Sequence, residues 1–490
     1  MRTPTRTPDR VDAGGTAVAP GPRRLREALA PSVLLGRLRA ALRADWHGPR
    51  FYVGALVVLV LSALTVAAFF LNHPAPELSP DSASYTDLAQ RIASRGQFMD
   101  AERAPGYPAL IAVVFAVAGS GNLAAVQLVQ GILFVLSGLE AYALAFLILR
   151  RSGLASALGL LVGGNLLLLS FAKPLLSEGV TLFLVLTLAL ALTLLLHTLQ
   201  PRDLWLVAGC ALLLYLTRLE WVYVAAPLFG FVLLVAALRA GGRAHVRRLW
   251  PHAVGATVLL YVLMGGYVLA NGAQTGYQGL TSIQNINLLG KVMQYHMQNE
   301  APPPYAAQAA VVDGYVQRGV TSPWAVVGEH KEFSRDHFAL AGAYASAVVK
   351  AHPVEFAVKT LPLLVTTLAP VLVASPIAAS GPLAKPLALD SKLSVQVHRS
   401  ALLFPLAVLL LLGLLVWRRT RGLVAVQAAG GVALLAVYDL AITSMGTYTE
   451  YPRLHSPFEP LMLLVVWGMV LAGGYMAYLR WLRPRLQAVR

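Results

Sequence analysis

The sequence has a single cysteine and few charged side chains. Because Cys210 is alone among 490 residues, neither an intramolecular disulfide nor a cysteine-based zinc cluster can form. Charged residues make up 13 % of the chain and hydrophobic residues 57 %. Several apolar runs approach the ~20 residues that cross a hydrocarbon core. This composition predicts an all-α polytopic membrane protein without an obvious second soluble domain.

Acidic residues are scarcer than basic ones, and both are placed unevenly. The formal charge is +16, with 39 Lys and Arg against 23 Asp and Glu. Residues 1–50 hold ten Arg and four acids, whereas residues 72–104 hold five acids and three Arg. This asymmetry follows the positive-inside rule, so the basic segments are expected to face the cytoplasm and its anionic lipids. It argues against a nucleic-acid partner.

The N-terminal region lacks the pattern of a cleavable signal peptide, because its first apolar run starts late and is long. Residues 1–22 are expected to form a disordered cytoplasmic tail. Residues 23–50 place leucines at helical spacing among arginines, which predicts a basic amphipathic segment on the membrane surface; a solvated basic linker is the alternative. Residues 480–490 are expected to form a second basic cytoplasmic tail.

Ten apolar segments are candidate membrane spans within a membrane domain over 51–479. An even number puts both termini in the cytoplasm, and the loops after residues 71, 172, 217, 270 and 444 outside. The candidate spans are 51–71, 122–149, 153–172, 179–197, 204–217, 221–238, 253–270, 400–417, 423–444 and 458–479.

Three further segments need separate interpretations. Residues 107–118, inside a first outer loop over 72–121, are apolar but too short to cross, so a re-entrant or interfacial segment is expected. Residues 360–377 are interrupted by three prolines and are expected to be interfacial, although a crossing stays open. They lie in a large outer loop over 271–399. Its hydrophilic part over 271–357 lacks the periodicity of an independent domain, and its amide-rich start at 271–299 is expected to be solvated.

Charged side chains gather at the predicted outer ends of the spans. A charge at mid-membrane costs ~2.5–3.5 kcal/mol on insertion scales, so apolar spans normally exclude it. Four outer loops that each carry charge at one face predict a polar pocket there, able to bind an anionic headgroup and to take a proton. These residues are Asp81, Arg103, Lys173, Glu178, Arg218, Glu220, Tyr451, Arg453 and His455.

Structural roles compete with this interpretation. Asp81 and Glu178 both fit helix starts, where a carboxylate caps backbone N–H groups. Arg103 could snorkel to the interface, Lys173 could be a helix-end cation, and Arg218 could form a local ion pair with Glu220. Glu140 and Asp439 fit helix–helix contacts. His296, His330 and His337 lack metal-ligand spacing and fit surface positions.

Two stretches of the first outer loop, Asp81-Ser-Ala-Ser-Tyr85 and Arg103-Ala-Pro-Gly-Tyr107-Pro, resemble the corresponding loop of membrane-embedded GT-C glycosyltransferases. The likeness is to the dolichyl-phosphate-mannose–protein mannosyltransferase-like superfamily, which includes the bacterial lipid A aminoarabinose transferases. Three later stretches agree in order and spacing: "AKPLLSEGVTLFLVLTLAL", "AGCALLLYLTRLEWVYVAAP" and "YPRLHSPFEPLMLLV". Ala104 and Leu219 depart from frequent prolines of the family, and His455 stands where the family varies, which bears on subfamily and substrate.

The resemblance implies a GT-C-type bundle of about ten to twelve transmembrane helices. It implies inverting transfer of a sugar from a polyprenyl-phosphate donor to a hydroxyl of a protein, glycolipid or cell-envelope glycan, at the extracytoplasmic face of the cell membrane. Asp81 matches the family's essential aspartate. No cofactor is obligatory, although Asp81 and Glu178 leave a divalent metal possible. The candidate residues are Asp81 and Glu178 for catalysis, Arg103, Arg218, Arg453 and Lys173 for the donor phosphate, and Tyr85, Tyr107, Glu220 and His455 for substrate positioning.

Competing functions stay open at the level of sequence. A transporter or lipid flippase is expected to show repeated halves and polar groups at the bilayer midplane, and the sequence has no internal repeat. An oligosaccharide ligase is expected to depend on Arg and His of a late outer loop, and a non-catalytic scaffold is a further possibility. The identities of the sugar and the acceptor do not follow from the sequence.

Overall fold

The computed structural model describes residues 48–368, 381–449 and 451–482, and in these ranges it is helical without a β-strand. The chain divides into a unit over His47–Gly474 and a second unit that contains both termini. Of the second unit, residues 475–482 are described. The expected N-terminal tail and nearly all of the amphipathic segment over 23–50, together with residues 483–490, lie outside the described residues.

The prediction of an all-α polytopic membrane protein is confirmed. Eight helical segments of the described chain are long and apolar enough to cross a membrane, and a ninth is present if the bent pair α7 (Ser152–Gly163) and α8 (Leu166–Ala172) forms one span. The eight are α3 (Pro49–Asn72), α6 (Leu123–Leu149), α9 (Glu178–Thr198), η1 with α11 (Leu219–Leu238), α12 (Gly242–Thr275), α18 with α19 (Ala384–Val416), α20 (Val424–Gly446) and α22 with its continuation (Glu459–Trp481).

Two boundaries differ from the expectation. The expected span 204–217 is helix α10 (Pro201–Thr217), whose 17 residues are at the short end of the range for a membrane crossing. The expected span 400–417 is the second half of a 33-residue helical run that begins at Ala384. The large loop therefore ends well before residue 399. Of the expected interfacial segment 360–377, the first part belongs to α17 (Pro353–Leu368), and residues 369–377 lie outside the described residues.

Small residues let the N-terminal helices pack closely. A Cβ added to Gly138 of α6 would lie 2.9 Å from the Cα of Gly163 in α7, so the two backbones meet where neither carries a side chain. Helix interfaces in membranes use small residues in this way, because apolar side chains gain little over lipid by being buried against one another. Helix α9 runs through the middle of this core, with most of its side chains buried.

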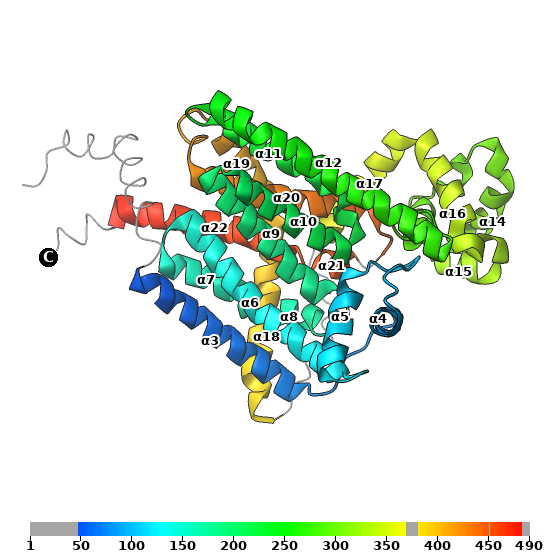
Figure 1. Ribbon diagram of the computed structural model, residues 1–490, viewed down its shortest axis with the longest axis horizontal. Helices are drawn as coiled ribbons and strands as arrows, with labels where there is room; N and C mark the ends of the chain where they lie inside the picture. The colour runs from blue at the N-terminus through cyan, green and yellow to red at the C-terminus, as the bar shows by residue number, and fades with distance from the viewer. Residues whose placement is uncertain (1–47, 369–380, 450, 483–490) are drawn as a thin grey trace, which may run out of the picture. The chain divides into compact units, whose positions relative to one another are not determined.

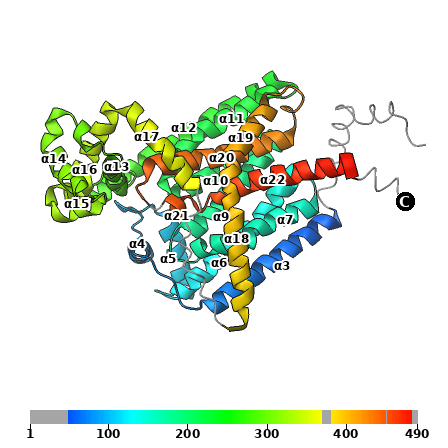
Figure 2. The same cartoon turned by 180° about the vertical axis from the view of Figure 1, so that it is seen from behind.

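The first expected outer loop folds as two short helices, α4 (Ser82–Arg95) and α5 (Gly106–Ala118). Helix α5 is apolar and has 13 residues, as the interpretation of 107–118 as too short to span requires. Its buried Tyr107 donates a hydrogen bond to Gln130 of α6. Figures 1 and 2 show α4 and α5 at the same end of the helices as α21 (Tyr451–His455).

The amide-rich start of the large loop is not solvated, contrary to expectation. Residues 283–294 form helix α13 (Ile283–Gln294), which buries Ile286, Leu289 and Met293. These side chains pack with α14 (Ala306–Gln317), α15 (Pro323–Glu329) and α16 (Lys331–Ala351) into a second hydrophobic core. We name residues 283–351 the helical insert.

A buried lysine fastens the helical insert to the transmembrane helices. The Nζ of Lys291 donates hydrogen bonds to the carbonyl of Ser444 in α20 at 2.5 Å and to the hydroxyls of Tyr451 at 2.9 Å and Tyr295 at 3.3 Å. Burial lowers the pKa of Lys291 from 10.5 to about 7. Tyr451 begins α21, so this contact also fixes the segment that carries Arg453.

This lysine predicts a pH-dependent stability. Between about pH 7 and 10.5 the unfolded chain binds a proton that the folded protein has released, so stability against unfolding rises with pH. Lys291 alone contributes about 2 kcal/mol between pH 7 and 9. Thermal unfolding in detergent should show this rise in the wild type and not in Lys291→Met. Lys350→Met, at an exposed position of α16, is the control; equal slopes for both variants would contradict the assignment.

Candidate active site

Asp81 lies directly before α4, but it does not cap that helix. Its side chain makes no capping hydrogen bond. The two carboxylate oxygens accept instead from two guanidinium groups: Oδ1 from Nη2 of Arg103 at 2.8 Å, and Oδ2 from Nη2 of Arg453 at 2.9 Å. The Asp81 side chain stays 31 % exposed, so a small ligand can reach it. The capping role considered for Asp81 is therefore wrong.

The loop over 72–121 holds Arg103 in place from three sides. Its Nε donates to Oγ of Ser84 at 2.8 Å, and its backbone N–H donates to Oδ1 of Asp100 at 2.9 Å. Its guanidinium lies over the ring of Tyr85, 4.8 Å from the centroid, in a cation–π contact. Tyr85 in turn meets the ring of Tyr107 edge-on at 5.1 Å. The contacts of Arg103 are specific, which argues against simple snorkelling.

Arg453 joins Asp81 to a second carboxylate. Its Nε lies 3.1 Å from Oε1 of Glu178, the first residue of α9. Glu178 is buried, with 3 % of its side chain exposed. Its second oxygen, Oε2, is also buried and has no hydrogen-bond partner in the described part of the chain. Buried polar atoms without a partner are uncommon, so Oε2 marks a position suited to a hydrogen-bonding ligand.

Arg218 ties the turn between α10 and α11 to the same place. It pairs with Glu220, Nε to Oε1 at 2.8 Å, as expected for a local ion pair. It also donates from Nη1 to the carbonyl of Leu454, the residue after Arg453. Arg218 therefore contacts α21 in addition to its local ion pair with Glu220.

His455 meets an acid of the membrane-spanning region. Its Nδ1 is hydrogen-bonded to Oδ2 of Asp439 in α20, and both side chains are buried. Its Nε2 is buried without a hydrogen-bond partner among the described residues. Glu140 makes the kind of helix–helix contact expected for it, accepting from Thr187 of α9 at 2.6 Å.

Lys173 is directed elsewhere. Its Nζ donates to the carbonyls of His73 at 2.7 Å and Ala75 at 3.1 Å, and lies 3.9 Å from Glu77. These contacts hold the chain between α3 and α4 against the end of α8. They give Lys173 a structural role and do not place it with Asp81.

The charges of the cluster support one another. Burial alone would raise the pKa of Asp81, but Arg103 and Arg453 outweigh it and hold that pKa below its ordinary value. Burial would lower the pKa of Arg218, but Glu220, Glu178 and Asp439 raise it. Asp81 therefore stays ionised and Arg218 stays charged, as expected for ionisable groups beside partners of opposite charge. We name Asp81, Arg103, Glu178, Arg218 and Arg453 the ionic cluster.

The ionic cluster does not fit a divalent metal. The two carboxylates proposed as ligands, Asp81 and Glu178, are bridged by the guanidinium of Arg453, which takes the place a cation would occupy. Within the described ranges, no group of three or more His, Cys, Asp or Glu side chains is arranged to hold a metal ion.

Comparisons with known proteins found no matching family model and no curated protein similar in sequence. Solved structures of the oligosaccharyltransferase AglB of Archaeoglobus fulgidus show a distant likeness. The complex with an inhibitory peptide and a dolichol-phosphate is 12 % identical, with a TM-score of 0.45 over 88 % of this chain and 52 % of that one. The complex with Zn and sulfate is 13 % identical, with a TM-score of 0.48 over 88 % and 51 %.

This chain spans about half the length of that oligosaccharyltransferase. At TM-scores below 0.5 and identities of 12 to 13 %, the likeness carries no weight for the activity of this chain.

The ion pair between Arg453 and Glu178 generates a prediction. Arg453→Gln should lower stability by about 3–5 kcal/mol, because it leaves a buried carboxylate without its cation. The double variant Arg453→Gln with Glu178→Gln should recover most of that loss, since no buried charge remains uncompensated. Thermal unfolding in detergent measures both. If the double variant is less stable than Arg453→Gln alone, the pairing is not the source of the effect.

Proposed function

We propose that the protein is an inverting glycosyltransferase that moves a sugar from a polyprenyl-phosphate donor to a hydroxyl acceptor. The observation that carries the proposal is the carboxylate of Asp81 held between Arg103 and Arg453 at 2.8 and 2.9 Å. In this arrangement a candidate general base, Asp81, is in hydrogen-bonding contact with two guanidinium groups that could bind a phosphate. Arginine suits a phosphate because its planar fork donates two parallel hydrogen bonds.

In the proposed reaction the acceptor hydroxyl attacks the anomeric carbon of the sugar. Its proton goes to the carboxylate of Asp81, a new bond forms between the acceptor oxygen and that carbon, and the bond from the carbon to the phosphate oxygen breaks on the opposite face. The polyprenyl phosphate leaves with one more negative charge. Fixed cations at the leaving oxygen stabilise this charge as it develops.

Donor binding also activates the base in this proposal. Without donor, both arginines donate to Asp81 and hold its pKa low, so the carboxylate is a weak base. A phosphodiester placed beside Arg103 and Arg453 competes for their N–H groups. Each hydrogen bond transferred from Asp81 to the phosphate raises the pKa of the carboxylate and makes it a stronger base. Chemistry is thereby coupled to the arrival of the donor.

The acceptor is assigned to the side of Glu178. The buried Oε2 of Glu178 and Nε2 of His455 have no hydrogen-bond partner in the described chain. The polar groups of a bound acceptor substrate would supply hydrogen bonds to both atoms. Tyr85 and Glu220 shape the surrounding walls and position the sugar, and the buried Tyr107 supports the ring of Tyr85. The helical insert, fastened beside α21 by Lys291, contributes to acceptor choice.

The proposed partners are the lipid bilayer, the lipid-linked donor and an acceptor of a protein, glycolipid or cell-envelope glycan. The positive-inside pattern assigns the ionic cluster to the extracytoplasmic face of the cell membrane, with both termini in the cytoplasm. No cofactor is required in this scheme, because the arginines supply the positive charge.

One feature favours a transporter instead. The pair α7 and α8 is bent by 47° at Asn165, where the buried His398 contacts the Asn165 side chain at 3.3 Å. Broken helices with buried polar side chains occur at transport sites. Movement of a labelled lipid across vesicles, without release of polyprenyl phosphate, would support this function.

The glycosyltransferase proposal predicts a loss of activity in one variant. Purified protein given a polyprenyl-phosphate sugar and acceptor should release polyprenyl phosphate, and Asp81→Asn should slow that release about 10²- to 10⁴-fold, the range for losing a general base. Asp87→Asn, at an exposed acid of the same helix, is the matched control. Turnover by Asp81→Asn at the wild-type rate would show that Asp81 is not the general base.

A further inference from the structure

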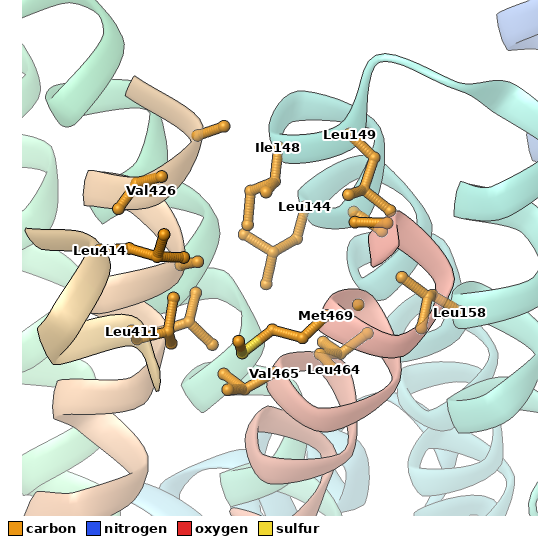
Figure 3. A pocket seen from close by; sticks show the side chains of 16 residues that line it. Leu144, Ile148, Leu149, Leu158, Leu411, Leu414, Val426, Leu464, Val465 and Met469 are labelled. Atoms are coloured by element: carbon orange, nitrogen blue, oxygen red, sulfur yellow. The ribbon is translucent and has the colours of Figure 1, made fainter. Parts of the chain in front are cut away.

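An apolar cavity lies between α6, α7, α19 (Phe404–Val416), α20 and α22 (Glu459–Ala477). Its volume is about 160 Å³, and all 16 lining residues are apolar. Figure 3 shows Leu144, Leu414, Val426 and Met469 directed into it from four of these helices. An apolar cavity of roughly 150 Å³ stays dry and binds a guest the size of benzene. The space therefore suits a segment of one hydrocarbon chain.

The cavity is remote from the ionic cluster. On α6, Gln130 accepts a hydrogen bond from Tyr107, whose ring meets Tyr85 beside Arg103, whereas the lining begins at Leu144. Fourteen residues of helix separate Gln130 from Leu144, which is about 21 Å. Figure 1 shows the turn from α19 to α20, which follows the lining residue Leu414, at the opposite end of the helices from α4 and α5.

Arginines stand at the end of the helices that borders the cavity. The turn from α19 to α20 contains Arg418, Arg419 and Arg421 without an acid, and the first two are exposed. The turn follows Leu414, a lining residue of α19, by four positions. Trp417 in the same turn is 53 % exposed, and tryptophan is enriched at the membrane–water interface. The arginines are thus at the expected level of lipid headgroups.

The face of α19 opposite the lining residues Leu411 and Leu414 is exposed and apolar. Leu409, Leu412 and Val416 are 65 %, 51 % and 78 % exposed, so this helix presents itself to the hydrocarbon of the bilayer. Of the lining residues, Leu414, Val426 and Met469 are partly exposed, so a lipid chain can reach the cavity from the membrane. A headgroup that carries negative charge would then meet the arginines of the turn.

We propose that this cavity and the arginine turn form a binding site for an anionic phospholipid. A segment of one acyl chain occupies the cavity, and the phosphate headgroup contacts Arg418 and Arg419. The positive charge of the turn favours this occupant over the tail of the proposed glycosyl donor, whose own phosphate belongs at the ionic cluster. The site is independent of the proposed sugar transfer and is tested by binding alone.

The test is native mass spectrometry of the full-length protein in mild detergent, titrated with phosphatidylglycerol and with phosphatidylcholine of the same acyl chains. The wild type should bind phosphatidylglycerol more tightly. Gly468→Leu should weaken that binding at least tenfold, because its side chain would enter the cavity. A Cβ at Gly468 meets only Leu158 Cδ1 at 4.0 Å, so the variant has room to fold.

Two matched controls separate the site from general effects. Gly473→Leu makes the same change on α22 at an exposed glycine outside the cavity lining, and should leave binding unchanged. Arg418→Gln and Arg419→Gln should each weaken phosphatidylglycerol about fivefold, as expected for one arginine near an anionic headgroup. Arg243→Gln and Arg247→Gln, at exposed arginines of α12, should not.

Three results would overturn the proposal. Equal affinity for the two phospholipids would show that the arginines do not select the headgroup. Unchanged phosphatidylglycerol binding by Gly468→Leu would show that the acyl chain does not occupy the cavity. Displacement of phosphatidylglycerol by polyprenyl phosphate, with Gly468→Leu weakening both, would assign the cavity to the donor tail instead.

Discussion

The contact on which the candidate site depends is a carboxylate shared by two guanidinium groups. Arg103 is 22 positions from Asp81 in the sequence, and Arg453 is 372 positions away. Charges that are buried in a protein are costly unless they are paired, so the ion pairs restrict where the loops that carry them can lie. The short helices α4, α5 and α21 are therefore positioned as much by this electrostatic requirement as by apolar packing.

The same requirement bears on the proposed reaction as well as on stability. Each arginine serves a carboxylate in the free protein, and each has N–H groups that an incoming phosphate can use. A network of opposite charges can exchange partners at little cost, whereas an unpaired base or an unpaired cation would be destabilising before substrate arrives. The helical insert adds a further structural constraint, because Lys291 holds Tyr451 two residues before Arg453.

Much of this arrangement follows from the sequence, since apolar runs, prolines and charge placement are local properties. The helical class, the short helix over 107–118 and the pairing of Asp81 with arginines were within reach of hydropathy and motif. The helical insert was not, because its apolar positions are separated by amides and become a core only when four short helices pack together. Lys291 was missed because a buried ammonium has no sequence pattern of its own. For Lys173 the alternative of a helix-end cation fits its position at the end of α8.

The most direct test of the shared carboxylate is a double-mutant cycle on Arg103 and Arg453, with polyprenyl-phosphate affinity as the measured quantity. Because both side chains bind Asp81 and are proposed to bind the same phosphate, the cost of Arg103→Gln should depend on whether Arg453 is present. We predict a coupling of about 0.5–3 kcal/mol, the range for residues in one network. Costs that add to within about 0.5 kcal/mol, as for independent sites, would contradict the account.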